Sequence, residues 1–155
     1  MTNKAIRQLP QRHEPEEIEV GEVIIDQRLQ PRLQQNFQTI IRYKEALEDG
    51  VCFPPITVAR IDGLLLLVDG FHRLKAHSAA GKATIEAVIL EGVTREEAFF
   101  EAVIANTQHG LGLTKEEKRA AFRRYIRAKR HVLKDGRVKS LPQWRGAPHA
   151  APLRH

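Results

Sequence analysis

Cysteine and long apolar runs are almost absent from this sequence. Cys52 is the single cysteine among 155 residues, which excludes an intramolecular disulfide framework and is typical of a protein from a reducing cytoplasm. No apolar run reaches the roughly 18 residues of a membrane-spanning helix, and the N-terminus has no apolar signal-peptide segment. We therefore expect a cytoplasmic protein without a membrane partner.

Zinc ligands at the usual spacing are also lacking. The seven histidines are scattered, and His72 and His77 form a pair at metal-like separation without a cysteine or third ligand nearby. Paired glutamates at 96–97 and 116–117 lie where helices are expected to begin, and the helix dipole accounts for them without catalysis. The sequence therefore argues against a zinc site and offers no clear carboxylate pair for two-metal chemistry.

Positive charge is in moderate excess. Lysine and arginine number 25 against 19 aspartates and glutamates, and the sequence pI is about 9.8. Such a balance favours a polyanionic partner but does not identify one. The length suits a single compact domain with one core.

Short apolar runs alternate with stretches of helical spacing. This pattern predicts an α+β fold, a small mixed sheet with packed helices followed by a basic helix. The expected strands cover residues 19–25, 56–58, 64–68 and 85–90, with an Asp62-Gly63 hairpin between the second and third. The expected helices cover residues 37–47 and 74–80, and two more begin at the capping boxes Thr94–Glu97 and Thr114–Glu117, the last continuing to about Leu133.

Four regions differ in composition. Residues 1–17 are polar and charged and are predicted to form a flexible leader with little order. The main domain is expected at 18–110 and a basic helical extension at 111–134. Residues 135–155 contain prolines and no helical period, which predicts an irregular tail without a helix-turn-helix.

Residues 68–76 carry the strongest chemical signal, because a buried strand runs through Asp69-Gly70 into a short helix. Free N–H groups at the start of such a helix favour an anion. Arg73 can bind a phosphate with two hydrogen bonds, and His72 can donate one, or carry a charge if its pKa is raised. The alternative is an ordinary Asp-Gly turn in which Arg73 pairs with a neighbouring carboxylate. The spacing alone does not decide between them.

The Gly70-Phe71-His72-Arg73 turn resembles the signature of the ParB/sulfiredoxin superfamily. Other landmarks of that superfamily follow in order over residues 18–130: Gln30-Pro31-Arg32, Gly50 with Pro55-Ile56-Thr57-Val58, Asn106-Thr107-Gln108-His109, and Leu113-Thr114-Lys115-Glu116-Glu117. The resemblance implies a nucleotide triphosphate, CTP or ATP with Mg²⁺, as the ligand. It implies phosphate contacts from Gly70, Phe71, His72 and Arg73, with Arg32 approaching from its loop and Asn106 orienting the metal or the sugar-phosphate.

Three departures from the superfamily motifs limit which of its activities can be expected of this chain. Phe71 stands where sulfiredoxins have their catalytic cysteine, so sulfinic-acid reduction has lost its nucleophile. Of the Glu-Arg-Arg that follows the glycine in ParB proteins, only Arg73 remains. Ala105 and His109 replace the acidic and basic members of the second motif, which predicts weak or absent nucleotide hydrolysis.

The last expected helix is rich in arginine. Arg119, Arg123, Arg127 and Arg130 could contact a DNA backbone, with Phe122, Tyr125 and Ile126 on the buried stripe. The alternative is a solvated helix face without a partner.

The favoured function is a nucleotide-binding, DNA-associated ParB-like module acting in plasmid or chromosome partition or in transcription regulation; a homodimer is left open. The alternatives are a metal-dependent nuclease, with Asp69 and His72 as catalytic residues, and a small-molecule phosphotransferase resembling free-serine kinases. Because its side chain is expected to point at the ligand, Arg73→Ala should weaken nucleotide binding with little loss of stability.

Overall fold

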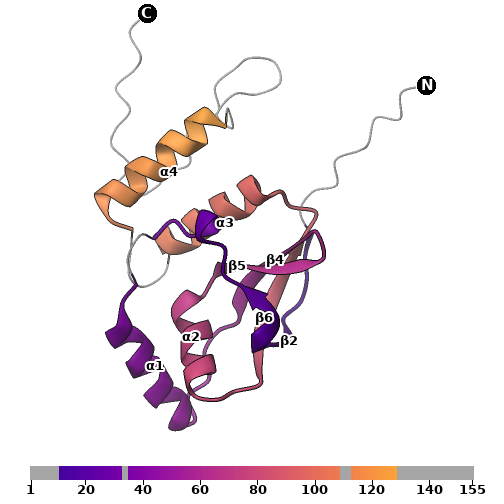
Figure 1. Ribbon diagram of the computed structural model, residues 1–155, viewed down its shortest axis with the longest axis vertical. Coiled ribbons are helices and arrows are strands. Elements are labelled where there is room, and N and C mark those ends of the chain that lie inside the picture. The colour runs from indigo at the N-terminus through magenta and orange to yellow at the C-terminus, as the bar shows by residue number, and fades with distance from the viewer. Residues whose placement is uncertain (1–10, 33–34, 109–112, 129–155) are drawn as a thin grey trace, which may run out of the picture.

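The computed structural model describes residues 11–32, 35–108 and 113–128. It confirms the α+β class: a six-stranded mixed sheet carries helices on both faces (Figure 1). The strands are β1 (Gln11–Arg12), β2 (Glu16–Glu19), β3 (Val23–Ile24), β4 (Ile56–Ile61), β5 (Leu64–Asp69) and β6 (Thr84–Glu91). The helices are α1 (Phe37–Glu48), α2 (Phe71–Ala79), α3 (Arg95–Gln108) and α4 (Lys115–Arg127), with 3₁₀ turns η1 (Val20–Glu22) and η2 (Gln27–Leu29).

The sheet has the strand order β1-β6-β4-β5-β3, and β2 also pairs with β6. The predicted hairpin between β4 and β5 is confirmed. Asp62 has φ 52° and Gly63 has φ 75°, the pair of left-handed residues that a tight two-residue hairpin requires.

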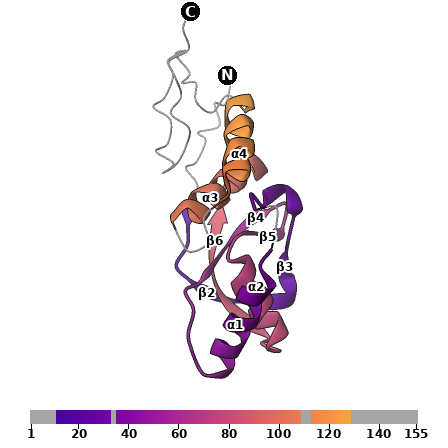
Figure 2. The same cartoon turned by 90° about the vertical axis from the view of Figure 1, so that its left-hand side faces the viewer.

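Successive side chains of β5 enter two separate hydrophobic cores, one on each face of the sheet, as expected for a strand buried on both faces. Leu65 and Leu67 pack with Leu74 of α2 on one face. Leu66 and Val68 pack with residues of α3 and α4 on the other. Helices α3 and α4 consequently gather at one end of the molecule and α1 and α2 at the other (Figure 2).

The first strand was predicted wrongly. Instead of one strand over residues 19–25, the chain forms β2, the turn η1 and β3, because β2 pairs antiparallel with β6 whereas β3 pairs parallel with β5. The leader prediction is also wrong for its described part. Gln11 and Arg12 pair with Glu91 and Leu90, and β2 begins at Glu16, since β6 offers its edge to both segments.

Both capping boxes are confirmed. The Thr94 hydroxyl accepts from the Glu97 N–H while the Glu97 carboxylate accepts from the Thr94 N–H, and Thr114 and Glu117 repeat the arrangement. Helix α4 is described as far as Arg127. The predicted continuation to Leu133, Arg130, His109 and the tail lie outside the described residues. Among the helices that are described, none has the length and apolar character needed to cross a membrane.

Candidate functional site

The turn between β5 and α2 forms as the sequence predicted. Gly70 has φ 105°, and a Cβ there would lie 2.5 Å from Cγ2 of Ile56, so both the backbone and the space require glycine. No side chain caps the start of α2 among the described residues, and the first N–H donated back within the helix is that of Leu74, to the Gly70 carbonyl. The N–H groups of Phe71, His72 and Arg73 are therefore available to an anion.

A cavity of about 490 Å³ opens beside this turn. Five of the residues predicted to bind phosphate lie in its wall: Arg32, Gly70, His72, Arg73 and Asn106. A smaller niche of about 40 Å³ shares four of these with it and adds Phe71. The structure thus brings together all six residues that the sequence assigned to a phosphate, from segments distant in the chain.

Arg32 occupies the niche through contacts with α3. Its Nη2 donates to Oδ1 of Asn106 at 3.1 Å, and Nδ2 of Asn106 donates to the Ala102 carbonyl at 2.7 Å. The loop that carries Arg32 is held by Gln30, whose Nε2 donates to the Leu67 carbonyl at 3.1 Å. Arg32 is therefore a positioned cation beside the uncapped start of α2.

Arg73 lines the cavity, but its guanidinium is held by other groups of the protein rather than left for a ligand. Its Nη1 donates to the carbonyls of Pro54 and Pro55 at 2.7 and 2.6 Å, and its Nη2 pairs with Oδ2 of Asp69 at 3.1 Å. The side chain is 16 % exposed. The guanidinium thus fastens the loop before β4 to the turn, and the alternative of pairing with a neighbouring carboxylate is the arrangement observed.

His72 also differs from expectation. Its Nε2 accepts a hydrogen bond from the Asn36 N–H at 3.3 Å. Burial and, to a smaller extent, the Arg32 guanidinium lower the pKa of His72 from 6.5, so the ring is neutral at pH 7. The sequence left open a charged ring if the pKa of His72 were raised; in the free protein that pKa is lowered instead.

The lowered pKa of His72 predicts an acid-sensitive contribution to stability. The unfolded chain, with a His72 pKa near 6.5, binds a proton more readily than the folded one, so stability should fall as pH drops below 6.5. His72→Gln keeps a hydrogen-bond acceptor without a titrating ring. Between about pH 7.5 and about pH 5.5 the melting temperature of wild type should therefore fall further than that of the variant. His13→Gln, at an exposed histidine, is the control; parallel losses in wild type and His72→Gln would contradict this role.

A metal ion fits the site less well than a phosphate. No group of three histidine, cysteine, aspartate or glutamate side chains in the described part of the chain could hold one. The Asn106 oxygen already accepts from Arg32, and Asp69 is paired with Arg73. The metal role of Asn106 stays a prediction.

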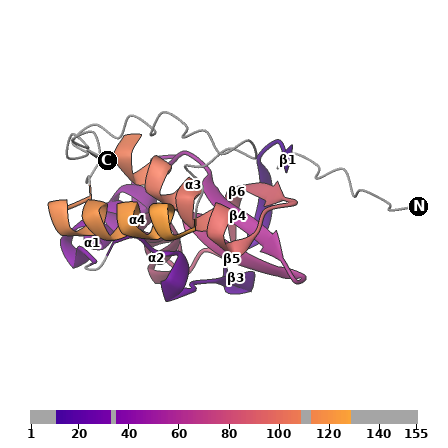
Figure 3. The same cartoon turned by 90° about the horizontal axis from the view of Figure 1, so that it is seen from above.

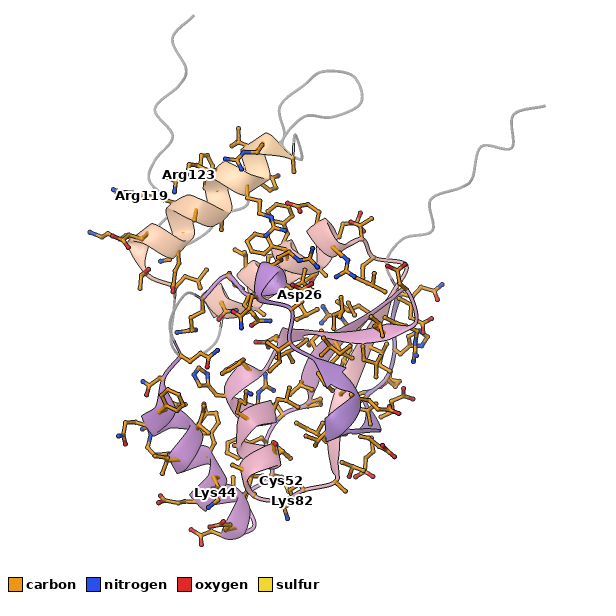
Figure 4. The ribbon with its side chains drawn as sticks, viewed as in Figure 1. Asp26, Lys44, Cys52, Lys82, Arg119 and Arg123 are labelled. Atoms are coloured by element: carbon orange, nitrogen blue, oxygen red, sulfur yellow. The ribbon has the colours of Figure 1, made fainter. Side chains whose placement is uncertain are left out.

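The predicted basic face lies on α4, the outermost helix at its end of the molecule (Figure 3). Arg119, Arg123 and Arg127 are exposed at a spacing of four residues, and Figure 4 shows Arg119 and Arg123 directed away from the body. We call these three residues the arginine stripe. The buried stripe is confirmed, since Tyr125 is buried and Phe122 and Ile126 pack against the same core.

Arg124 belongs to neither stripe. Its Nε and Nη2 donate to the Glu96 carboxylate at 2.8 and 2.9 Å, its Nη1 donates to the Arg28 carbonyl at 2.8 Å, and it lies 3.8 Å from the centre of the Phe99 ring. These contacts fix α4 to α3 and η2.

Asp26 completes this junction. Its carboxylate accepts from the Arg28 side chain and from Nη1 of Arg95, and the hydrogen bond from Arg28 is the main reason that the Asp26 pKa is lowered. Sequence reasoning missed Asp26, and it grouped Arg124 with the basic residues of the last helix without predicting these contacts. The one available signal was Asp26 itself, a good N-cap residue two positions before Arg28.

Part of the chain resembles two proteins from Streptomyces in sequence. No family model matches the chain. It is 43% identical over 68 residues to the transcriptional regulator NovG of Streptomyces niveus, and 40% identical over 60 residues to a possible regulatory protein of the streptomycin biosynthesis operon of Streptomyces griseus. These matches cover 44% and 39% of this chain and 20% and 17% of the relatives, so the chain spans about a fifth of their length.

Three solved structures share its fold with a TM-score of 0.57. One is a Pnob8-like ParB N domain, 15% identical over 83% of this chain and 57% of that one. The others are ParB from Caulobacter crescentus with CTP-gamma-S (17% identical, 80% and 68% covered) and with the centromeric parS site (18% identical, 74% and 58% covered). The resemblance to ParB-type proteins is thus confirmed at the level of the fold.

Proposed function

We propose that this chain, with the fold of ParB N-terminal domains, is a nucleotide-binding module of a DNA-associated regulator. The observation that carries the proposal is the cavity beside the Gly70 turn, where the uncapped start of α2 and the Arg32 guanidinium meet. Together they offer N–H donors and a positive charge to a phosphate.

The likeness to a ParB that was solved with CTP-gamma-S supports a nucleotide as the source of that phosphate. In this proposal the N–H groups of α2 bind the phosphate and Arg32 adds a charge-assisted hydrogen bond. His72, neutral in the free protein, becomes a donor if the phosphate raises its pKa. CTP and ATP remain the two candidate ligands.

The arginine stripe is proposed to contact DNA. Its three guanidinium groups stand on the outer face of α4, where a phosphate backbone can approach without displacing core contacts. A similar ParB was solved with its parS site. Regulation of transcription is favoured over partition, because the relatives with regulatory names are 43% and 40% identical over the 68 and 60 residues matched, whereas the ParB structures are under 20% identical.

Asp69 and His72 are less well arranged for catalysis. Asp69 is paired with Arg73 and ends the strand at the turn, an arrangement that serves the fold without chemistry. The nuclease and phosphotransferase alternatives therefore have no observation in their favour beyond the placement of both residues at the cavity wall.

Thermal unfolding in the presence of CTP, ATP, ADP and GTP tests the proposal. A ligand at about 100 times its Kd should add about 2.7 kcal/mol of stability. Arg32→Ala should weaken binding by about 1.5–3 kcal/mol, whereas Arg42→Ala, an exposed arginine of α1, should leave it unchanged. Without any nucleotide-dependent stabilisation of wild type, the nucleotide part of the proposal fails.

A further inference from the structure

Part of the cavity wall differs in chemistry from the phosphate niche. Tyr43 of α1 and Phe53 of the following loop lie in this part of the wall with their ring centres 4.8 Å apart and their planes at 34°. Both side chains are partly exposed rather than buried in either core. We call this pair the aromatic wall.

The aromatic wall is attached to the phosphate niche by Arg73. Phe53 is followed by Pro54 and Pro55, and Arg73 of the turn holds both proline carbonyls. Because its position is already fixed, the aromatic wall should lose little conformational entropy when a ligand binds. The aromatic wall is thus held at a fixed position relative to the Gly70 turn.

The rest of the cavity wall is of mixed chemistry, since Thr39, Thr57 and Glu101 line it as well. Prolines have no N–H, and the carbonyls of Pro54 and Pro55 already accept from Arg73. Val88 and the 38 % exposed Ile104 also line the cavity. The aromatic and aliphatic side chains of this wall can cover a flat ring.

We propose that the cavity binds a nucleotide by stacking its base on the aromatic wall, so that affinity depends on the presence of a planar ring. This inference rests on the proposed function, since the phosphate niche anchors the other end of the ligand.

Calorimetric titration of the full chain with ATP, CTP and inorganic tripolyphosphate tests the stacking. Stacking on an aromatic side chain is worth roughly a 5- to 150-fold change in affinity. Phe53→Ala and Tyr43→Ala should therefore lose ATP affinity by such a factor while tripolyphosphate binding stays unchanged. Tyr43→Phe keeps the ring and should bind like wild type. Phe37→Ala, which truncates a 72 % exposed aromatic residue of α1 outside the cavity, is the matched control.

One result would overturn the inference alone: tripolyphosphate binding as tightly as ATP and CTP. Binding of none of the three ligands would instead overturn the proposed function as well. Should Phe53→Ala fail to fold, Phe53→Leu fills the same space without a π face, and unchanged ATP affinity in that variant would also count against stacking.

Discussion

Arg73→Ala should lower the free energy of unfolding by about 3 kcal/mol. The substitution removes three charge-assisted contacts from a side chain that is 16 % exposed, and it leaves the Asp69 carboxylate and the carbonyls of Pro54 and Pro55 without their donor. Urea denaturation measures the loss. Lys75→Ala, at an exposed residue of the same helix, removes the same charge and should change stability little.

Lysine at position 73 separates charge from geometry. A point charge on a flexible stem can keep the pairing with Asp69 but cannot hold two carbonyls and the carboxylate at once. Arg73→Lys should therefore be intermediate in stability. A fully stable Arg73→Ala protein that has lost only nucleotide affinity would show instead that the guanidinium serves the ligand.

Neutralising the arginine stripe should flatten the salt dependence of DNA binding. Each lost phosphate contact lowers the slope of log affinity against log salt by about 0.9, so glutamine at positions 119, 123 and 127 should reduce it by up to about 2.7. Because the stripe faces away from the core, melting temperature should hardly change. The measurement is duplex binding by fluorescence anisotropy over a series of salt concentrations, with unrelated sequences affected alike.

A charge-matched control distinguishes contact from overall charge. Arg42, Lys44 and Lys82 belong to the end of the molecule away from α4, where Figure 4 labels two of them. Replacing these three by glutamine lowers the formal net charge from +6 to +3, as the stripe variant does. Equal slopes in the two triple variants would mean that the stripe is only a solvated face.

Local signals in the sequence were sufficient for much of the fold. The hairpin at Asp62-Gly63, the glycine turn at Gly70 and the capping boxes at Thr94 and Thr114 depend on residues within a few positions of each other. Their conformations are set by φ preferences and short-range hydrogen bonds, which the sequence displays directly. The split of the first strand was not predictable in this way, because its halves pair with strands far along the chain.

The candidate site was predicted as a set of residues but not as a geometry. The turn signature indicated which side chains would meet at the cavity, yet an arginine in a first helical turn can reach either a ligand or nearby acceptors. The position of the Pro54 and Pro55 carbonyls decides this for Arg73, and that position depends on packing around Ile56. The meeting of Tyr43 with Phe53 likewise requires α1 to end and the chain to reverse at Gly50.

The stretch from Asp26 to Arg32 contacts both proposed binding sites: the phosphate niche and helix α4, which carries the arginine stripe. Its Arg28 carbonyl accepts from Arg124 of α4, and its Arg32 lies in the phosphate niche. If nucleotide binding shifts this stretch and thereby changes the affinity for DNA by some factor, DNA must change the affinity for nucleotide by the same factor. Substitutions within residues 26–32 would then change both affinities together, so the two sites are best separated by variants on the aromatic wall and on the arginine stripe.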